Sequence, residues 1–186
     1  MNFTENKQLL LGDNENEIIH FLENSIQQRR NIRNIITFAM SHDKHLPINY
    51  ILDHQNRRDQ RGSYDFSFIL TCVFRYANVH FYNLFNEQNL IKKDVHLIKI
   101  IIQNKHNDFI FDNLTDWFNG KQIFAASLKT AIIYQNIEIF NYLMNNENLT
   151  PFLTRKTMNY CFQQISKMNI EMFETLSQKY LELFKI

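Results

Sequence analysis

The chain has 186 residues, with 20 Lys and Arg against 19 Asp and Glu, and its net charge of +1 gives it no general attraction to nucleic acid or membranes. Three Gly and two Pro are too few for the many turns of a β-sandwich or barrel, so the composition argues against an all-β fold. The glycines, at Gly12, Gly62 and Gly120, are also too far apart to form a dinucleotide-binding or P-loop motif.

The apolar segments predict a protein without a membrane span. The longest of them, such as Ile100–Ile102, are far shorter than a bilayer requires. The first residues, MNFTENKQLLLGDNENE, lack the basic start and long apolar run of a secretory signal. Cys72 and Cys161 are single, distant cysteines. We therefore expect reduced core residues and a cytoplasmic location, with a disulfide between the two as the alternative.

From the N-terminus onward, apolar residues recur at the three-and-four spacing that places them on one face of a helix. Asp13 or Asn14 can cap the first of these helices near Glu17, and Thr154 precedes a helical stretch after Pro151 has broken the chain. No segment alternates strictly between polar and apolar residues, so we predict an all-α fold. The apolar sets are, in chain order, Ile18, Ile19, Leu22 and Ile26; Ile32, Ile35, Ile36 and Ala39; Val95, Ile98, Ile101 and Ile102; Leu128, Ala131 and Ile132; Ile139 and Leu143; and Met172, Leu176 and Tyr180.

The sequence repeats itself toward its C-terminus. The segment Asn136–Phe140 (NIEIF) returns as Asn169–Phe173 (NIEMF), and Leu143 has Leu176 as its counterpart at the same offset. Three further asparagines, Asn107, Asn78 and Asn49, precede Asn136 at equal intervals that are slightly shorter than the interval from Asn136 to Asn169. The residues around Asn49 match the pattern poorly.

This spacing predicts a short hinge with an asparagine that opens a helix about every thirty residues. Asn tolerates left-handed backbone and can cap the next helix, so it suits a turn between two helices that fold back on each other. Each helix pair can then bury its remaining apolar face on the next pair. We predict a solenoid-like stack of antiparallel helical hairpins that forms a single domain over residues 1–186, with about five repeats.

The best-matching repeats cover residues 124–180, and a weaker copy runs from Phe68 to Val79. Its helix–hinge–helix pattern consists of Leu128 and Ala131, then Gln135-Asn136, then Ile137–Phe140 with Leu143-Met144. This pattern resembles that of the ankyrin-repeat family, in which an inner helix, a hinge and an outer helix follow one another. The resemblance implies a divergent ankyrin-like array that binds a partner protein through its inner helices and hinge-side tips.

The chain departs from the ankyrin pattern in three respects. The Thr-Pro-Leu-His start of the family's repeat is absent throughout, and the interval from Asn107 to Asn136 is short for an ankyrin repeat. The hinge glycine is replaced by Ala77, Gln135 and Met168. A different array of helical hairpins therefore stays open as an alternative.

Degenerate arrays of this Asn- and Ile-rich kind resemble those of effectors from intracellular bacteria that live in amoebae. The C-terminal segment, with Glu171, Glu174 and Glu182, is similar to the acidic secretion tails of such effectors. The resemblance implies a cytoplasmic protein, or one secreted into the cytosol of a host cell, whose partner is a host or bacterial protein.

His42 and Asp43 form the sharpest catalytic candidate. A His-Asp pair after an apolar helix resembles the core of the HD-type metal phosphohydrolases, in which a divalent metal acidifies water for attack on phosphate. His20 and one of three aspartates, Asp108, Asp112 or Asp116, could complete such a set. The competing interpretation is a polar turn at a helix end, and we favour it because the family's apolar-Gly continuation is missing.

No complete catalytic or metal set is present elsewhere in the sequence. No cysteine and histidine spacing fits zinc, and Cys72, which could pair with His80 as a nucleophile, lies within the apolar run Phe66–Phe74 where burial is expected. We therefore predict a non-enzymatic protein without metal or cofactor.

Two arginine clusters with identical spacing suggest a second kind of binding. They are Arg29, Arg30 and Arg33, and Arg57, Arg58 and Arg61. If they adjoin in space, their guanidinium groups can hold an acidic or phosphate-bearing partner, such as a phosphorylated surface, an anionic lipid or a nucleic-acid backbone. Nucleic acid is not the expected main partner. The competing interpretation is a solvated charged face, with Asp53 and Asp59 as local ion partners.

Further candidate contacts come from the positions of side chains in the repeat. The inner helices and hinge tips carry Tyr76, Lys129, Tyr134, Gln163 and Lys167. Trp117 is the only tryptophan, and it is either a packed helix residue or an exposed anchor for a partner.

Overall fold

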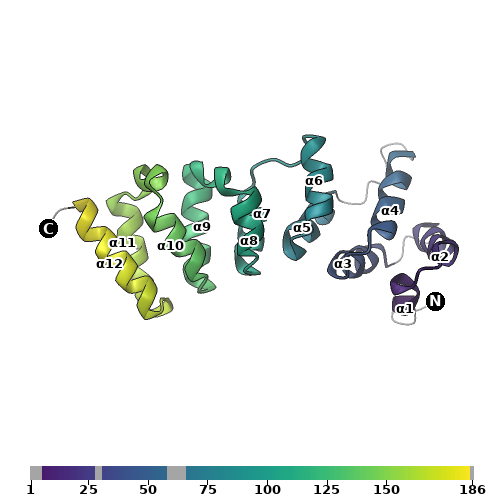
Figure 1. The fold of residues 1–186 in the computed structure, drawn as a ribbon, viewed down its shortest axis with the longest axis horizontal. Coiled ribbons are helices and arrows are strands. Elements are labelled where there is room, and N and C mark those ends of the chain that lie inside the picture. Colours follow the sequence, from purple (N-terminus) through teal and green to yellow (C-terminus); the bar gives the residue numbers. More distant parts are fainter. Residues whose placement is uncertain (1–5, 28–30, 58–65, 185–186) are drawn as a thin grey trace. The chain divides into compact units, whose positions relative to one another are not determined.

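The computed structural model describes residues 6–27, 31–57 and 66–184, apart from the side chains of residues 55–57 and 165. Every regular element within these ranges is helical, so the prediction of an all-α fold is confirmed for the described chain (Figure 1). The chain divides into two compact units, Met1–Glu87 and Gln88–Ile186. The single domain expected over residues 1–186 stays a prediction.

The first unit is built from helices whose apolar faces meet. Helix α2 packs against α4, α3 packs against α4 and α5, and α5 packs against α6. Its fully buried side chains include Leu22, Ile35, Ile48 and Ile69, which follow the apolar spacing of their helices. The helices are α1 (Lys7–Leu11), α2 (Glu15–Gln27), α3 (Ile32–Ser41), α4 (His45–Arg57), α5 (Phe66–Tyr76) and α6 (Val79–Glu87).

The second unit consists of three consecutive helix pairs. Helix α7 contacts α8, α9 contacts α10, and α11 contacts α12; in addition α9 contacts both α7 and α11, and α10 contacts α12. Phe118, Phe124 and Phe140 are buried among these helices, where their large rings fill the space between pairs. The elements are α7 (Val95–Gln103), α8 (Asn107–Asn113), η2 (Thr115–Asn119), α9 (Lys121–Ile133), α10 (Ile137–Asn145), η3 (Glu147–Phe152), α11 (Arg155–Gln163), η4 (Ile165–Lys167) and α12 (Ile170–Phe184).

Helices α3, α5, α7 and α9 end in the same kind of turn. One residue adopts left-handed backbone, and the next N–H donates to the carbonyl five residues earlier. This Schellman turn satisfies carbonyl groups that a helix end leaves unpaired. The left-handed residues are Asp43 (φ 53°), Ala77 (φ 50°), Lys105 (φ 58°) and Gln135 (φ 50°). The N–H to carbonyl distances are 2.9 Å from Lys44 to Ala39, 3.0 Å from Asn78 to Val73, 3.4 Å from His106 to Ile101 and 2.8 Å from Asn136 to Ala131.

The left-handed residue is not the predicted asparagine but the residue before it. Ala77 and Gln135 take the positive φ, and each is followed directly by an asparagine. Between α11 and α12 the turn differs, because a 3₁₀ turn, Ile165–Lys167, takes the place of the left-handed residue there. Asn49 lies inside α4, so its predicted hinge role is also wrong.

The predicted capping role of the hinge asparagines is confirmed at three places. The side-chain oxygen of Asn78 accepts the N–H of Phe81 at 3.1 Å, and that of Asn136 accepts the N–H of Ile139 at 3.3 Å. Asn169 accepts the N–H of Met172 at 2.9 Å in the same way. Each of these bonds satisfies a backbone donor in the first turn of the following helix. Asn107 differs, since it is the first residue of α8 and His106 takes the cap position.

The side-chain amides of two of these asparagines also reach back to the preceding turn. Asn78 donates to the carboxylate of Asp43 at 3.0 Å. Asn136 donates to the carbonyl of Ile102 at 3.1 Å and to the side-chain oxygen of Asn107 at 2.8 Å. Both asparagines are buried, with Asn136 only 2% exposed. A buried amide that is satisfied on both its oxygen and its nitrogen therefore joins one helix pair to the next.

Replacing Gln135 with Gly should raise the free energy of unfolding by about 1 kcal/mol, because a left-handed residue with a Cβ is strained and Gly relieves that strain. The matched control is Tyr134→Gly at the preceding position, where φ is −98° and Gly both adds backbone entropy to the unfolded chain and removes a ring that is 41% exposed. That control should lower the free energy of unfolding by at least about 1 kcal/mol. Urea titration followed by circular dichroism measures both, and equal losses in the two variants would show that the turn is not left-handed.

Replacing Asn136 with Asp should lower the free energy of unfolding by about 3 kcal/mol. The carboxylate can still cap α10, but it loses both amide hydrogen bonds and faces the Ile102 carbonyl and the Asn107 oxygen. Asn169→Asp is the control, because the cap to Met172 is retained there and an Asp suits a helix start, so its effect should stay within about 0.5 kcal/mol.

The pH dependence of the Asn136→Asp variant provides a second check. Burial beside two acceptors raises the pKa of the new carboxyl in the folded state above its unfolded value. As the pH falls, the carboxyl is therefore protonated in the folded state at a higher pH than in the unfolded state. The stability deficit relative to wild type should therefore shrink as the pH falls from 7 toward about 4. A deficit that is constant over this range, or that matches the Asn169→Asp control at pH 7, would contradict the buried amide geometry.

Candidate functional site

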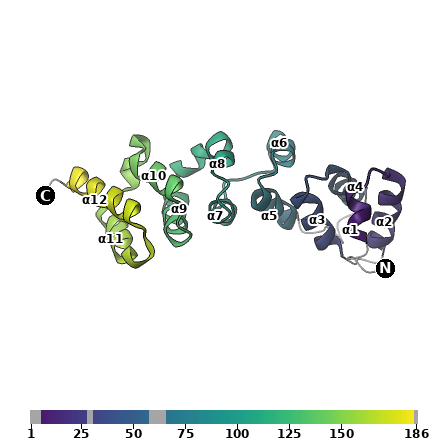
Figure 2. The same cartoon turned by 60° about the horizontal axis from the view of Figure 1, so that its bottom comes forward.

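Helices α7, α9 and α11, each the first helix of its pair, form a continuous row in the second unit because α9 contacts both of the others. We call this surface the α7–α9–α11 row. Figure 2 shows these three helices along one side of the second unit and α8, α10 and α12 along the other. The core-facing side of the row contains Ile101, Leu128 and Met158, all buried, which fixes the opposite side of each helix toward solvent.

Exposed side chains recur along the row at equivalent helical positions. They are Lys99 and Gln103 on α7, Lys129 and Ile133 on α9, and Asn159 and Gln163 on α11. The two exposed residues of each helix follow those of the preceding helix at the same interval in the sequence. The three helices therefore present equivalent turns to solvent. A partner that lies across the row would meet the same two positions on each helix.

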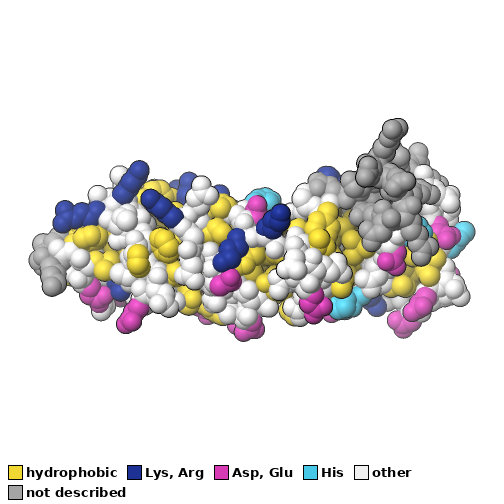
Figure 3. All heavy atoms as spheres, turned by 90° about the horizontal axis from the view of Figure 1, so that it is seen from above, with side chains coloured by type: hydrophobic (Ala, Val, Ile, Leu, Met, Phe, Trp, Pro, Cys, Tyr) yellow, Lys and Arg dark blue, Asp and Glu magenta, His cyan; other side chains and the backbone are white. Residues whose placement is uncertain are grey.

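The two sides of the second unit carry opposite charge. The row helices contain five basic residues, Lys99, Lys121, Lys129, Arg155 and Lys156, and their sequences contain no acidic residue. The second helices of the pairs contain six acidic residues, Asp108, Asp112, Glu138, Glu171, Glu174 and Glu182, with Lys179 as their one base. Figure 3 shows Lys and Arg side chains of the second unit gathered mostly toward one edge, and Asp and Glu toward the opposite edge. The row therefore has a positive local field although the whole chain is nearly neutral.

The hinge end of α9 adds apolar area to this basic surface. Ile133 and Tyr134 are neighbours at the end of the helix and remain 42% and 41% exposed. Exposed large apolar and aromatic side chains are typical of the central part of a protein-binding surface. The row thus combines apolar contact area with positive charge.

Four of the contact residues predicted from the sequence are exposed in the second unit. Lys129 and Gln163 belong to the row, Tyr134 lies at the hinge end of α9, and Lys167 lies in η4. Tyr76 ends α5 in the first unit, where it is half-buried. The structure therefore leaves the four second-unit residues accessible to a partner.

Trp117 is not an exposed anchor. Its side chain in η2 is 5% exposed, and the neighbouring Phe118 is fully buried. Of the two interpretations of this residue, the packed one is confirmed, because the 3₁₀ turn directs both rings into the helix pairs around α9.

Most of the two arginine clusters lies outside the described residues. This applies to Arg29, Arg30, Arg58 and Arg61, and to the side chain of Arg57. The remaining member, Arg33, places its guanidinium 5.0 Å from the ring centre of Phe68, within cation–π range. An anion-binding patch built from these arginines stays a prediction.

His42 and Asp43 belong to the turn that ends α3. His42 is the cap residue, and its Nδ1 lies 2.9 Å from the carbonyl of Phe38 on its own helix. Asp43 is the left-handed residue, and its carboxylate accepts from His45 at 2.9 Å and from Asn78 at 3.0 Å. The helix-end interpretation of this pair is confirmed, since both residues serve the turn and its tie to the next helix pair.

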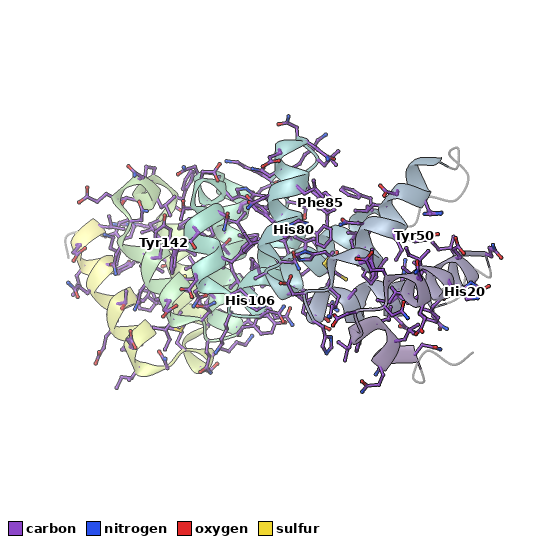
Figure 4. All side chains as sticks on the ribbon, turned by 45° about the vertical axis from the view of Figure 1, so that its right-hand side comes forward. His20, Tyr50, His80, Phe85, His106 and Tyr142 are labelled. Atoms are coloured by element: carbon purple, nitrogen blue, oxygen red, sulfur yellow. The ribbon has the colours of Figure 1, made fainter. Side chains whose placement is uncertain are left out.

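Side chains near this turn do not converge as a metal site would require. Among the described residues, no three His, Cys, Asp or Glu side chains come together in a way that could hold a metal ion. His80 on α6 stacks its ring on that of His45 with 4.0 Å between the ring centres, whereas His20 lies apart from them on α2 (Figure 4). An open depression of about 250 Å³ in the first unit is lined by Asp43 together with Asp13 and Glu15, among other residues.

Both cysteines are free and buried, as the sequence analysis expected for core residues. Burial raises the pKa of the Cys161 thiol to about 12. Burial also raises the pKa of Cys72, against smaller opposing effects of the Thr37 hydroxyl and the Arg75 charge. A thiol with a raised pKa is a poor nucleophile at neutral pH, which argues against a Cys72–His80 catalytic pair.

The charge difference between the two helix layers was not predicted from the sequence. The signal was present, because acidic residues cluster after each hinge and basic residues before it, but it becomes visible only once the helices are assigned to layers.

Comparison with protein-family models, with curated proteins and with solved structures gave no match. Within the described residues, no helix is both long and apolar enough to cross a bilayer.

Proposed function

We propose that this chain is a divergent ankyrin-like array of helical hairpins and acts as a non-enzymatic protein-binding module. The α7–α9–α11 row is its binding surface in the second unit, and the partner is an acidic protein segment. The repeated Schellman turns, the capping asparagines and the contacts α7–α9–α11 and α10–α12 support a repeated hairpin architecture. The resemblance to effectors extends the proposal to action in a cytosol, either the cell's own or that of a host.

The single observation that carries the proposal is the charge difference between the layers. Five basic residues and no acidic one on the row helices hold a positive field over a surface that also exposes Ile133 and Tyr134. Complementary charge steers a partner to the surface and fixes its register, while apolar contact supplies much of the affinity. An acidic segment with interspersed apolar residues meets both requirements.

A pull-down with the full chain as bait tests the proposal when wild type and a charge-reversed variant run in parallel. The variant Lys99→Glu with Lys129→Glu reverses the charge at two equivalent positions of the row. We expect it to lose the captured acidic proteins, with an affinity at least about tenfold weaker in direct titration. Wild-type binding should also weaken as ionic strength rises from about 0.15 M to 1 M, because the Debye length falls from about 8 Å to 3 Å.

The matched control is Lys92→Glu, an exposed lysine in the segment before α7 and outside the row. It makes the same kind of charge reversal in the same unit and should leave binding within about threefold of wild type. Capture of the same proteins by wild type and by the doubly reversed variant would refute the proposal. Capture of nucleic acid in place of protein would refute it too, and would assign the row to phosphate binding.

A further inference from the structure

Helix α12 carries a second surface with apolar character, on the side that faces away from the rest of the second unit. Met172 and Leu176 on its packed side are fully buried. On the opposite side of the helix Ile170 is 77% exposed, Phe173 40% and Leu181 56%. Their spacing of three and eight residues places these three on one stripe of the helix. We call this stripe the α12 face.

Helix α10 has residues equivalent to Ile170 and Phe173 of the α12 face, and α10 is in contact with a further helix, α12. Helix α10 begins Ile-Glu-Ile-Phe and α12 begins Ile-Glu-Met-Phe, so Phe140 corresponds to Phe173 and Asn141 to Glu174. Phe140 is fully buried on α10, which both α9 and α12 contact. Phe173 is 40% exposed on α12, whose main neighbours among the described helices are α10 and α11.

The contact between α10 and α12 also shows which polar groups meet across this kind of interface. Asn141 donates to the carboxylate of Glu171 at 2.9 Å and accepts from the hydroxyl of Thr175 at 3.1 Å. Glu174 occupies on α12 the position that Asn141 has on α10. A helix that covers the α12 face would therefore contact the carboxylate of Glu174. At the equivalent position of the α10–α12 contact, α12 contacts the amide of Asn141.

The charges along the edge of the α12 face select the chemistry of the occupant. Glu174 adjoins the stripe and is exposed, whereas Glu171 contacts Asn141 of α10 and Glu182 forms an ion pair with Lys179 at 3.4 Å. A covering helix with acidic residues on its edge would be repelled, and a basic edge would be attracted. The Glu174 carboxylate beside an apolar stripe also disfavours an anionic lipid surface.

We infer that the α12 face docks an amphipathic helix of a partner protein, with an apolar stripe and basic residues along the edge that meets Glu174. The docked helix lies across α12 as α12 lies across α10. This site is separate from the α7–α9–α11 row, and it selects the opposite charge in its partner.

A peptide built from this chain tests the inference with the full-length protein. The probe has the sequence of residues 169–184, which covers α10 in the structure, with Glu171 replaced by Lys so that a base opposes Glu174. Fluorescence anisotropy of the labelled peptide should show saturable binding to the wild-type chain. Phe173→Asp with Leu181→Asp should weaken it at least about tenfold, because two exposed anchors of the stripe are lost. Circular dichroism should show that this variant keeps the wild-type helix content and a cooperative thermal unfolding, with a somewhat lower midpoint because Phe173 and Leu181 are only 40% and 56% exposed.

A charge exchange makes the test specific to the proposed geometry. Glu174→Lys in the chain should weaken the Lys-containing peptide at least about fivefold, and the peptide that keeps its native Glu171 should bind this variant better than it binds wild type. Lys129→Glu, on the α7–α9–α11 row, is the control and should leave peptide affinity unchanged.

Four results would overturn the inference. They are absence of peptide binding to wild type up to about 1 mM, equal binding to the Phe173→Asp/Leu181→Asp variant, concentration-dependent dimerisation of the chain that this variant abolishes, and binding to phosphatidylserine vesicles that it abolishes. The third result would indicate that the α12 face binds a second copy of the chain, and the fourth that it binds a membrane.

Discussion

The buried side chain of Asn136 connects two helix pairs through both ends of its amide. The oxygen caps α10 by accepting the N–H of Ile139, and the nitrogen donates to Ile102 and Asn107 of the preceding pair. Asn78 repeats the arrangement with Phe81 and Asp43 in the first unit. Because an unpaired amide costs free energy when it is buried, each pair can close its turn only if the preceding turn is in register. The asparagine thus couples a local cap to the relation between neighbouring pairs.

This register places the helices in layers, and the layers divide the charge. With each turn fixed, the first helices of the second unit lie together on one side and the second helices on the other. The basic residues before each turn then combine into one surface, and the acidic residues after it combine into another. A chain with a net charge of +1 can in this way present a positive surface and a negative one in the same unit. Both binding proposals follow from this division, with partners of opposite charge.

Sequence patterns were sufficient for features that depend on neighbouring residues. The apolar spacing predicted the helices, Thr154 was expected to precede a helix and does cap α11, and the repeated Asn-Ile-Glu segment located the caps at Asn136 and Asn169. The position of the left-handed residue was missed, because Ala77 and Gln135 have no propensity for that backbone and adopt it under the constraint of the Schellman turn. The burial of Trp117 was one of two open interpretations, since exposure depends on packing between elements. The charge layers depend on contacts between helices of successive pairs, such as α7 with α9, which no local pattern encodes.

A double-mutant cycle at Asn107 and Asn136 measures the connection between helix pairs directly. The free energy of unfolding would be determined for Asn107→Ala, Asn136→Ala and the double variant of the full chain, by urea titration under the same conditions. We predict a coupling free energy of about 1 kcal/mol, because the 2.8 Å hydrogen bond between these side chains links two helix pairs. Additive effects, with a coupling below about 0.3 kcal/mol, would contradict this prediction and would show that this side-chain hydrogen bond does not couple the two pairs.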